Sequence, residues 1–97
     1  MPVKELVINL DPQKVATWYQ KFAGIRANTY DAKTVETVIR DFIEAQCGPD
    51  VDNPIQDIKL DGHRDVNMEI RYWTLRITGE RPEFMKVCRG ISENFAL

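Results

Sequence analysis

Residues 66–78, Val-Asn-Met-Glu-Ile-Arg-Tyr-Trp-Thr-Leu-Arg-Ile-Thr, carry the pattern on which the fold depends. Apolar side chains alternate along this stretch with the period of two that a strand requires, but the phase changes midway. The first apolar set lies at even positions and ends at Tyr72, whereas the second lies at odd positions and begins at Trp73. A β-bulge near Tyr72-Trp73 returns both sets to one face. We therefore predict an irregularity there; in its absence, Tyr72 or Trp73 becomes an exposed aromatic anchor for a partner.

A shorter strand, at about residues 55–60, precedes this stretch and is expected to pair with it as a hairpin. Asp61-Gly62 favours a turn between them. A two-residue turn there would set an apolar side chain against a carboxylate. A five-residue loop over 61–65 instead sets Leu60 opposite Val66, and we prefer it because the register of a hairpin follows its apolar face.

The remaining elements follow from apolar spacing and capping residues. Residues 4–10 alternate as a strand, with Leu6, Ile8 and Leu10 on one face. Helical spacing predicts three helices: one that starts at Asp11-Pro12 and ends at Gly24, one over 32–47 with Asp31 as its N-cap, and one that Pro82 opens. The expected fold is one α+β domain over residues 1–97, in the order β-α-α-β-β-α. We expect an antiparallel sheet of about three strands with helices packed on it.

Bulk composition narrows the class of protein. The chain has 97 residues, a net charge of −2 and a pI of about 5.3. It has neither an apolar leader nor an apolar run of membrane-spanning length, so we expect a cytoplasmic protein with no membrane partner. Cys47 and Cys88 lie far apart and are expected to be reduced thiols.

No residue pattern in the chain indicates catalysis. His63 is the only histidine and has several aspartates near it in sequence. One interpretation is a metal site or an acid/base pair, and the other is a polar hairpin tip, which we prefer. Cys88 falls on an apolar helical stripe, and phosphate-loop, metalloprotease and nucleophile-elbow motifs are absent. We predict a protein that is not an enzyme and binds neither metal nor cofactor.

Charge is unevenly distributed along the chain. The segment 41–65 carries −5, whereas the rest of the chain carries +3. If the acids of this segment share one face, that face suits a basic partner surface. We therefore predict a partner-binding acidic face made of Asp41, Glu44, Asp50, Asp52, Asp57, Asp61 and Asp65.

In size, solitary domain and acidity the chain is similar to the phage-encoded inhibitors of bacterial defence, such as anti-CRISPR proteins. The resemblance implies a non-catalytic inhibitor with an acidic face. Its partner would be a basic protein or ribonucleoprotein complex, whose nucleic-acid-binding surface the inhibitor occupies in competition with phosphates. Such an inhibitor binds little nucleic acid itself.

Two further resemblances imply an alternative, a small nucleic-acid-binding regulator. Residues 6–12 followed by two helices, with Val-Ile-Arg-Asp-Phe-Ile at 38–43 in the second, resemble ribbon-helix-helix repressors. The element order, with Leu-Arg-Ile-Thr-Gly at 75–79 before a Pro-initiated helix, resembles a KH domain. That family clamps RNA with a GxxG loop between its first two helices. Here Gly24-Ile25-Arg26-Ala27 lies at that place and lacks the second glycine.

Overall fold

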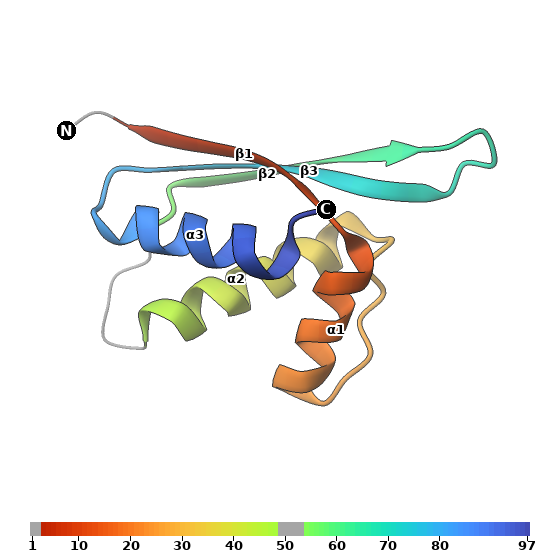
Figure 1. The fold of residues 1–97 in the computed structure, drawn as a ribbon, viewed down its shortest axis with the longest axis horizontal. Helices are drawn as coiled ribbons and strands as arrows, with labels where there is room; N and C mark the ends of the chain where they lie inside the picture. The colour runs from red at the N-terminus through yellow and green to blue at the C-terminus, as the bar shows by residue number, and fades with distance from the viewer. Residues whose placement is uncertain (1–2, 49–53) are drawn as a thin grey trace.

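A computed structural model describes residues 3–48 and 54–97 of the chain. Within these residues the elements are β1 (Lys4–Leu10), α1 (Pro12–Ala23), α2 (Ala32–Cys47), β2 (Asp57–Arg64), β3 (Ile70–Gly79) and α3 (Glu83–Phe95). The predicted α+β class and β-α-α-β-β-α order are confirmed. The sheet is antiparallel with strand order β1-β3-β2, and the helices lie together on one side of it (Figure 1).

The core lies between the sheet and this helical layer. Trp73, Leu75 and Ile77 of the central strand β3 point towards the helices and are almost completely buried. Each such side chain contributes about 1.5–3 kcal/mol through burial. The helices supply most of the remaining buried apolar side chains: Val15, Val35, Val38, Ile39, Phe42, Ile43, Phe84, Val87, Ile91 and Phe95. In the described part of the chain, no helix combines the length and the apolar character that crossing a membrane requires.

Capping residues set the helix ends much as the sequence predicts. The carboxylate of Asp11 accepts a hydrogen bond from the amide of Gln13 at 2.9 Å, which caps α1. Gly24 ends α1 in the left-handed region at φ 69°. Asp31 precedes α2 in an extended conformation, but its carboxylate accepts from the hydroxyl of Thr34 at 3.0 Å and makes no backbone cap bond.

The predicted hairpin register is wrong. β2 continues through Asp61-Gly62 to Arg64, the connecting loop is 65–69, and Leu60 lies opposite Leu75 instead of Val66. Val66 is 98% exposed in the loop. The register follows the odd-numbered apolar residues of β3, because these are the ones that the helices bury.

Gly62 therefore serves in the strand and not in a turn. A Cβ at this position would lie 2.8 Å from Cδ1 of Ile70 and 3.0 Å from Cζ3 of Trp73. Asp61-Gly62 matches a turn signal in the sequence, but the glycine gives clearance for two core side chains. As a consequence, the prediction of His63 at a hairpin tip is also wrong, since His63 lies within β2.

The irregularity predicted in the long strand is present, but it lies earlier than Tyr72-Trp73. His63 lies opposite Tyr72 and Arg64 lies opposite Ile70, so Arg71 is the extra residue of a bulge. Pairing continues unbroken through Tyr72 and Trp73. Trp73 is 4% exposed and its indole Nε1–H donates to the carbonyl of Thr29 at 2.8 Å. Its burial excludes Trp73 as an exposed anchor, whereas Tyr72 lies on the opposite face of the sheet.

Candidate functional site

The candidate site is the face of the sheet that points away from the helices, which we call the outer face. Alternation along each strand places on it every second residue. In the described part of the chain no helix covers this face (Figure 1). Its side chains come from all three strands and comprise Glu5, Val7 and Asn9; Asp57, Lys59, Asp61 and His63; and Tyr72, Thr74, Arg76 and Thr78.

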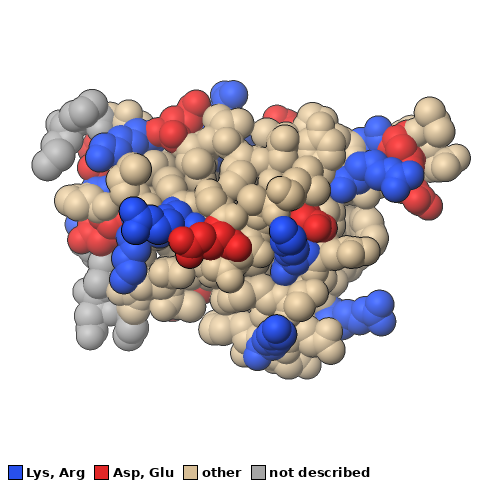
Figure 2. Space-filling model, viewed as in Figure 1, with Lys and Arg blue, Asp and Glu red and all other residues tan. Residues whose placement is uncertain are grey.

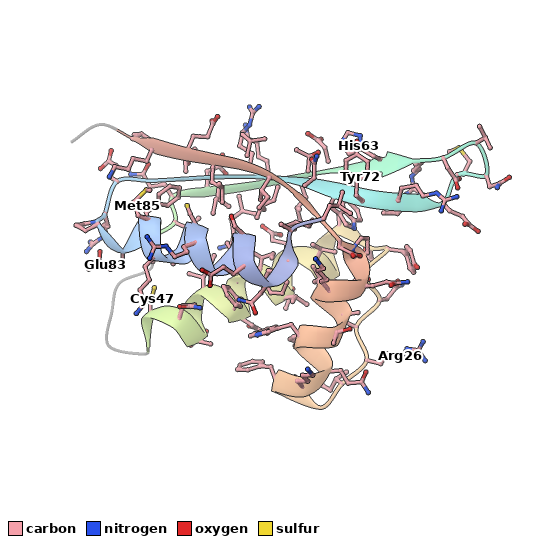
Figure 3. All side chains as sticks on the ribbon, in the orientation of Figure 1. Arg26, Cys47, His63, Tyr72, Glu83 and Met85 are labelled. Carbon is pink, nitrogen blue, oxygen red and sulfur yellow. The ribbon has the colours of Figure 1, made fainter. Side chains whose placement is uncertain are left out.

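A chain of direct contacts crosses the outer face from β2 to β1. The imidazole of His63 stacks on the ring of Tyr72, with centroids 4.4 Å apart and planes 14° from parallel (Figure 3). Nε2 of His63 lies 2.7 Å from Oγ1 of Thr74, and that hydroxyl donates to Oδ1 of Asn9 at 2.9 Å. Because the hydroxyl proton is used on Asn9, Nε2 of His63 must carry the proton of the first bond. The contacts fix both the ring position and the tautomer of an exposed histidine.

Charges on the outer face are mixed. Glu5 lies 3.9 Å from Arg76, and Asp57 lies 3.9 Å from Lys59. Both pairs are long and solvent-exposed, so each contributes little to stability. Asp61 makes no ion pair within residues 3–48 and 54–97.

Those predicted acidic residues that the structure describes do not gather on one surface. Asp57 and Asp61 share the outer face, whereas Asp41 and Glu44 lie on α2 in the helical layer. The carboxylate of Asp41 accepts a hydrogen bond from Tyr19; partial burial first, and this bond second, raise the pKa of Tyr19. Asp50 and Asp52 lie outside the described residues. On the face drawn in Figure 2, acidic and basic side chains are interspersed.

Asp65 organises the β2–β3 loop. Its Oδ1 accepts from the amides of Asn67 at 2.8 Å and Glu69 at 3.0 Å, and its Oδ2 lies 2.7 Å from a guanidinium nitrogen of Arg71. The bond from Glu69, then that from Asn67 and the charge of Arg71, hold the pKa of Asp65 below its usual value against an opposing effect of desolvation. The negative charge of Asp65 is therefore already balanced by partners within the loop and by Arg71.

The cysteines are not poised as nucleophiles. Partial burial, and then the nearby charge of Glu83, raise the pKa of the Cys47 thiol. Burial raises the pKa of the Cys88 thiol. Both thiols are therefore protonated at neutral pH, and a thiolate is the nucleophilic form. Within the described ranges, no three His, Cys, Asp or Glu side chains are arranged to hold a metal ion.

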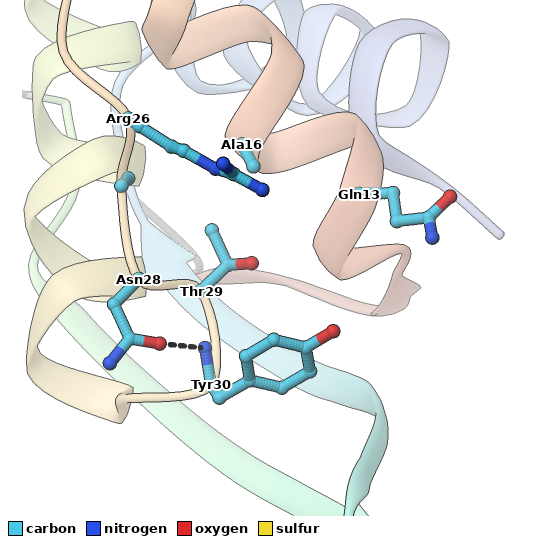
Figure 4. A pocket seen from close by; sticks show the side chains of 7 residues that line it. Gln13, Ala16, Arg26, Asn28, Thr29 and Tyr30 are labelled. Carbon is cyan, nitrogen blue, oxygen red and sulfur yellow. Dashed lines mark hydrogen bonds between the residues drawn. The ribbon is translucent and has the colours of Figure 1, made fainter.

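A separate groove of about 440 Å³ lies between α1 and the loop that joins it to α2, and sequence reasoning did not find it (Figure 4). Its polar lining comprises Gln13, Arg26, Asn28, Thr29 and Tyr30 and includes no carboxylate. In the described part of the chain, Arg26 makes no ion pair. Tyr30, which is 59% exposed, also lines a neighbouring groove whose charged lining residues are Arg64, Glu69 and Arg71.

Sequence signals for the outer face were present but depended on the register. Alternation along residues 4–10 predicts Asn9 on the face opposite Leu6, Ile8 and Leu10, and the structure places it there, opposite Thr74. The partnership of His63, Tyr72 and Thr74 required the true hairpin register, which the Asp-Gly turn signal concealed. Comparisons with protein families, with curated proteins and with solved structures find no match for this chain.

Proposed function

We propose that this chain is a non-catalytic binding protein whose outer face docks on a partner protein. The observation that carries the proposal is the contact chain from His63 and Tyr72 through Thr74 to Asn9 on an uncovered sheet face. Side chains that are already ordered lose little conformational entropy when a partner covers them. An amphipathic tyrosine on a rigid sheet is also a typical anchor at protein interfaces.

The charges of the outer face favour a basic partner. Asp61 makes no ion pair in the described part of the chain, while the pairs of Asp57 and Glu5 are long enough to exchange for a stronger partner. An arginine of the partner can stack on the ring of Tyr72 and reach the carboxylate of Asp61 on the neighbouring strand. The partner would therefore present arginine or lysine side chains to this face.

In its narrower form, the proposal makes the chain a cytoplasmic inhibitor similar to phage-encoded anti-CRISPR proteins. It would occupy the nucleic-acid-binding surface of a basic protein or ribonucleoprotein complex. Asp57 and Asp61 support this form, because they are the members of the predicted acidic set that share the outer face. Asp41, Glu44 and Asp65 do not add to it.

Photo-crosslinking tests the docking surface directly. A crosslinking amino acid at Val7 lies on the outer face, and the same group at Arg89 lies on the exposed side of α3. We expect one partner to be captured from Val7 and not from Arg89. Combined Asp57→Lys and Asp61→Lys changes should abolish the capture while circular dichroism stays unchanged. Equal capture from Arg89, or a folded double variant with unchanged affinity, contradicts the proposal.

A second candidate function, nucleic-acid binding, is favoured by the groove beside Tyr30. Arg26 is an unpaired cation in the described part of the chain, and the groove that it lines contains no acid. Such a surface fits phosphate and a stacked base. Fluorescence anisotropy with single-stranded RNA and duplex DNA separates the two candidates. The outer-face proposal expects little binding at physiological salt, whereas salt-sensitive binding that Arg26→Ala and Tyr30→Ala remove establishes the second candidate.

A further inference from the structure

The two edges of the sheet, β1 and β2, differ in whether other residues hydrogen-bond to their outward-pointing backbone groups. Along β1, the C-terminal residues cover one end of the edge. The amide of Asp11 donates to the carbonyl of Phe95 at 2.8 Å, and the amide of Leu97 donates to the carbonyl of Asn9 at 3.1 Å. Along β2, no described residue pairs with the outer edge. An unpaired edge presents a row of backbone donors and acceptors that another strand can occupy.

The hydrogen bonds at β1 identify the backbone groups that face the open edge. The carbonyl of Asn9 and the amide of Asp11 point away from β3, so the amide and carbonyl of Leu10 between them point towards β3. Leu10 pairs with Trp73, and the odd-numbered residues of β3 are therefore the ones that bond to β1. Even-numbered residues of β3 then bond to β2, in agreement with the bond of 2.8 Å from the Gln56 amide to the Thr78 carbonyl. By the same alternation, the groups of β2 that point to the open edge are the amides and carbonyls of Ile58, Leu60 and Gly62.

We propose that two copies of this chain pair antiparallel through β2, with Leu60 opposite Leu60 of the second copy, to form one continuous six-stranded sheet. A two-fold axis at Leu60 sets Ile58 opposite Gly62 of the second copy. All outward-pointing amides and carbonyls of these residues then find partners, since each faces its counterpart across the axis. This inference does not depend on the proposed function, but both use the carboxylate of Asp61, so a partner on the outer face would compete with Lys59 of the second copy for it.

Side-chain charges select this register. With the axis at Leu60, Lys59 lies opposite Asp61 of the second copy, and Asp57 lies opposite His63. Both combinations occur twice and place a carboxylate against a basic side chain. An axis at Lys59 would instead set Lys59 against Lys59 and Asp57 against Asp61, and an axis at Asp61 would set Asp61 against Asp61. These neighbouring registers repel.

The helix side of the seam also fits a second copy. Ile58 and Leu60 are only partly buried, and with Ala32, Lys33 and Glu36 of α2 they line a groove of about 280 Å³ beside the open edge. In the dimer, Leu60 of the second copy enters at this seam and covers the exposed part of both leucines. Apolar surface that the monomer leaves in water is thereby buried.

A charge swap tests the pairing. Analytical ultracentrifugation of the wild type, from about 1 µM to about 1 mM, should give a concentration-dependent dimer. Lys59→Asp and Asp61→Lys should each weaken it about tenfold or more, because each creates two like-charge pairs. An equimolar mixture of these two variants should restore dimerisation as a heterodimer, since both pairs between positions 59 and 61 are again opposite in sign. Glu5→Lys, with the same charge change on the other edge strand, should leave the dimer intact.

Hydrogen exchange on the wild type gives a second, independent measurement. The amides of Ile58, Leu60 and Gly62 should exchange more slowly as concentration rises, while those of β1 should not change. A wild type that remains monomeric at about 1 mM overturns the proposal. It is equally overturned if the two charge variants fail to associate on mixing, or if protection appears along β1 instead.

Discussion

The two faces of β3 differ in what their side chains do. On the helix side, Trp73, Leu75 and Ile77 are at most 4% exposed and belong to the core. On the outer face, Thr74 and Arg76 interact with polar groups of the neighbouring strands and stay in contact with water. Alternate residues of a strand point to opposite faces, so β3 supplies core side chains on one face and solvent-accessible polar side chains on the other.

This difference indicates how stability and recognition are divided. Changes on the helix side should lower the free energy of unfolding, whereas changes on the outer face should leave it nearly unaltered and alter contacts with a partner.

Truncation of a side chain in the middle of the core should have the largest effect. Leu75 is fully buried between Ile8 of β1 and Leu60 of β2. Leu75→Ala should lower the free energy of unfolding by about 2–5 kcal/mol through lost burial and a residual cavity. Urea denaturation followed by circular dichroism measures this loss.

Arg76→Ala is the matched control, since Arg76 is the next residue and points to the outer face. Its exposed pair with Glu5 contributes at most about 1 kcal/mol. If the two alanine variants lost equal stability, the division between the two faces would be wrong.

The glycines that face the helix side should show the next largest effect. A Cβ at Gly79 would meet the backbone carbonyl oxygen of Pro54 and lie 2.6 Å from Cδ2 of Phe84. A Cβ at Gly62 would chiefly meet the movable end of the Ile70 side chain. Gly79→Ala should therefore cost about 1–3 kcal/mol in thermal or urea unfolding, and Gly62→Ala should cost less. The reverse order would contradict the packing described on this face.

The sequence predicts the helix side of β3 better than the outer face. Helix bounds, capping at Asp11, the strand over residues 4–10 and the order of elements follow from apolar spacing, which responds to burial alone. The register of the hairpin does not follow, because Val66 and Met68 match the strand pattern yet lie exposed in the loop. Contacts on the outer face depend on that register, so the candidate site could not be assembled from the sequence.

On the outer face, the hydroxyl of Thr74 is the shared member of the contact chain. Thr74→Val keeps the shape of the side chain but removes the bonds to His63 and Asn9. The free energy of unfolding should fall by less than about 1 kcal/mol, because the side chains that make these contacts are accessible to water. Nitrogen-15 NMR of the His63 ring should nevertheless change from one tautomer to a mixture of both. A ring with unchanged nitrogen shifts would show that Thr74 does not fix the tautomer.

Asp65 lies in the β2–β3 loop and belongs to neither face, and its effect on stability should be recognised by its pH dependence. Amides of Glu69 and Asn67, with the charge of Arg71, hold the pKa of Asp65 below its unfolded value of about 3.9. A carboxyl group with a lowered pKa stabilises the fold at pH values above that unfolded value, and the contribution is lost as pH falls towards the folded pKa.

In Asp65→Asn the contribution is absent at every pH. The stability difference between wild type and Asp65→Asn, measured by urea denaturation, should therefore be constant near neutral pH and shrink below about pH 4. Arg71→Gln should reduce this pH dependence without abolishing it, since the two amide bonds remain. A difference that stays constant down to about pH 2 would mean that the charged form of Asp65 is not what holds the loop.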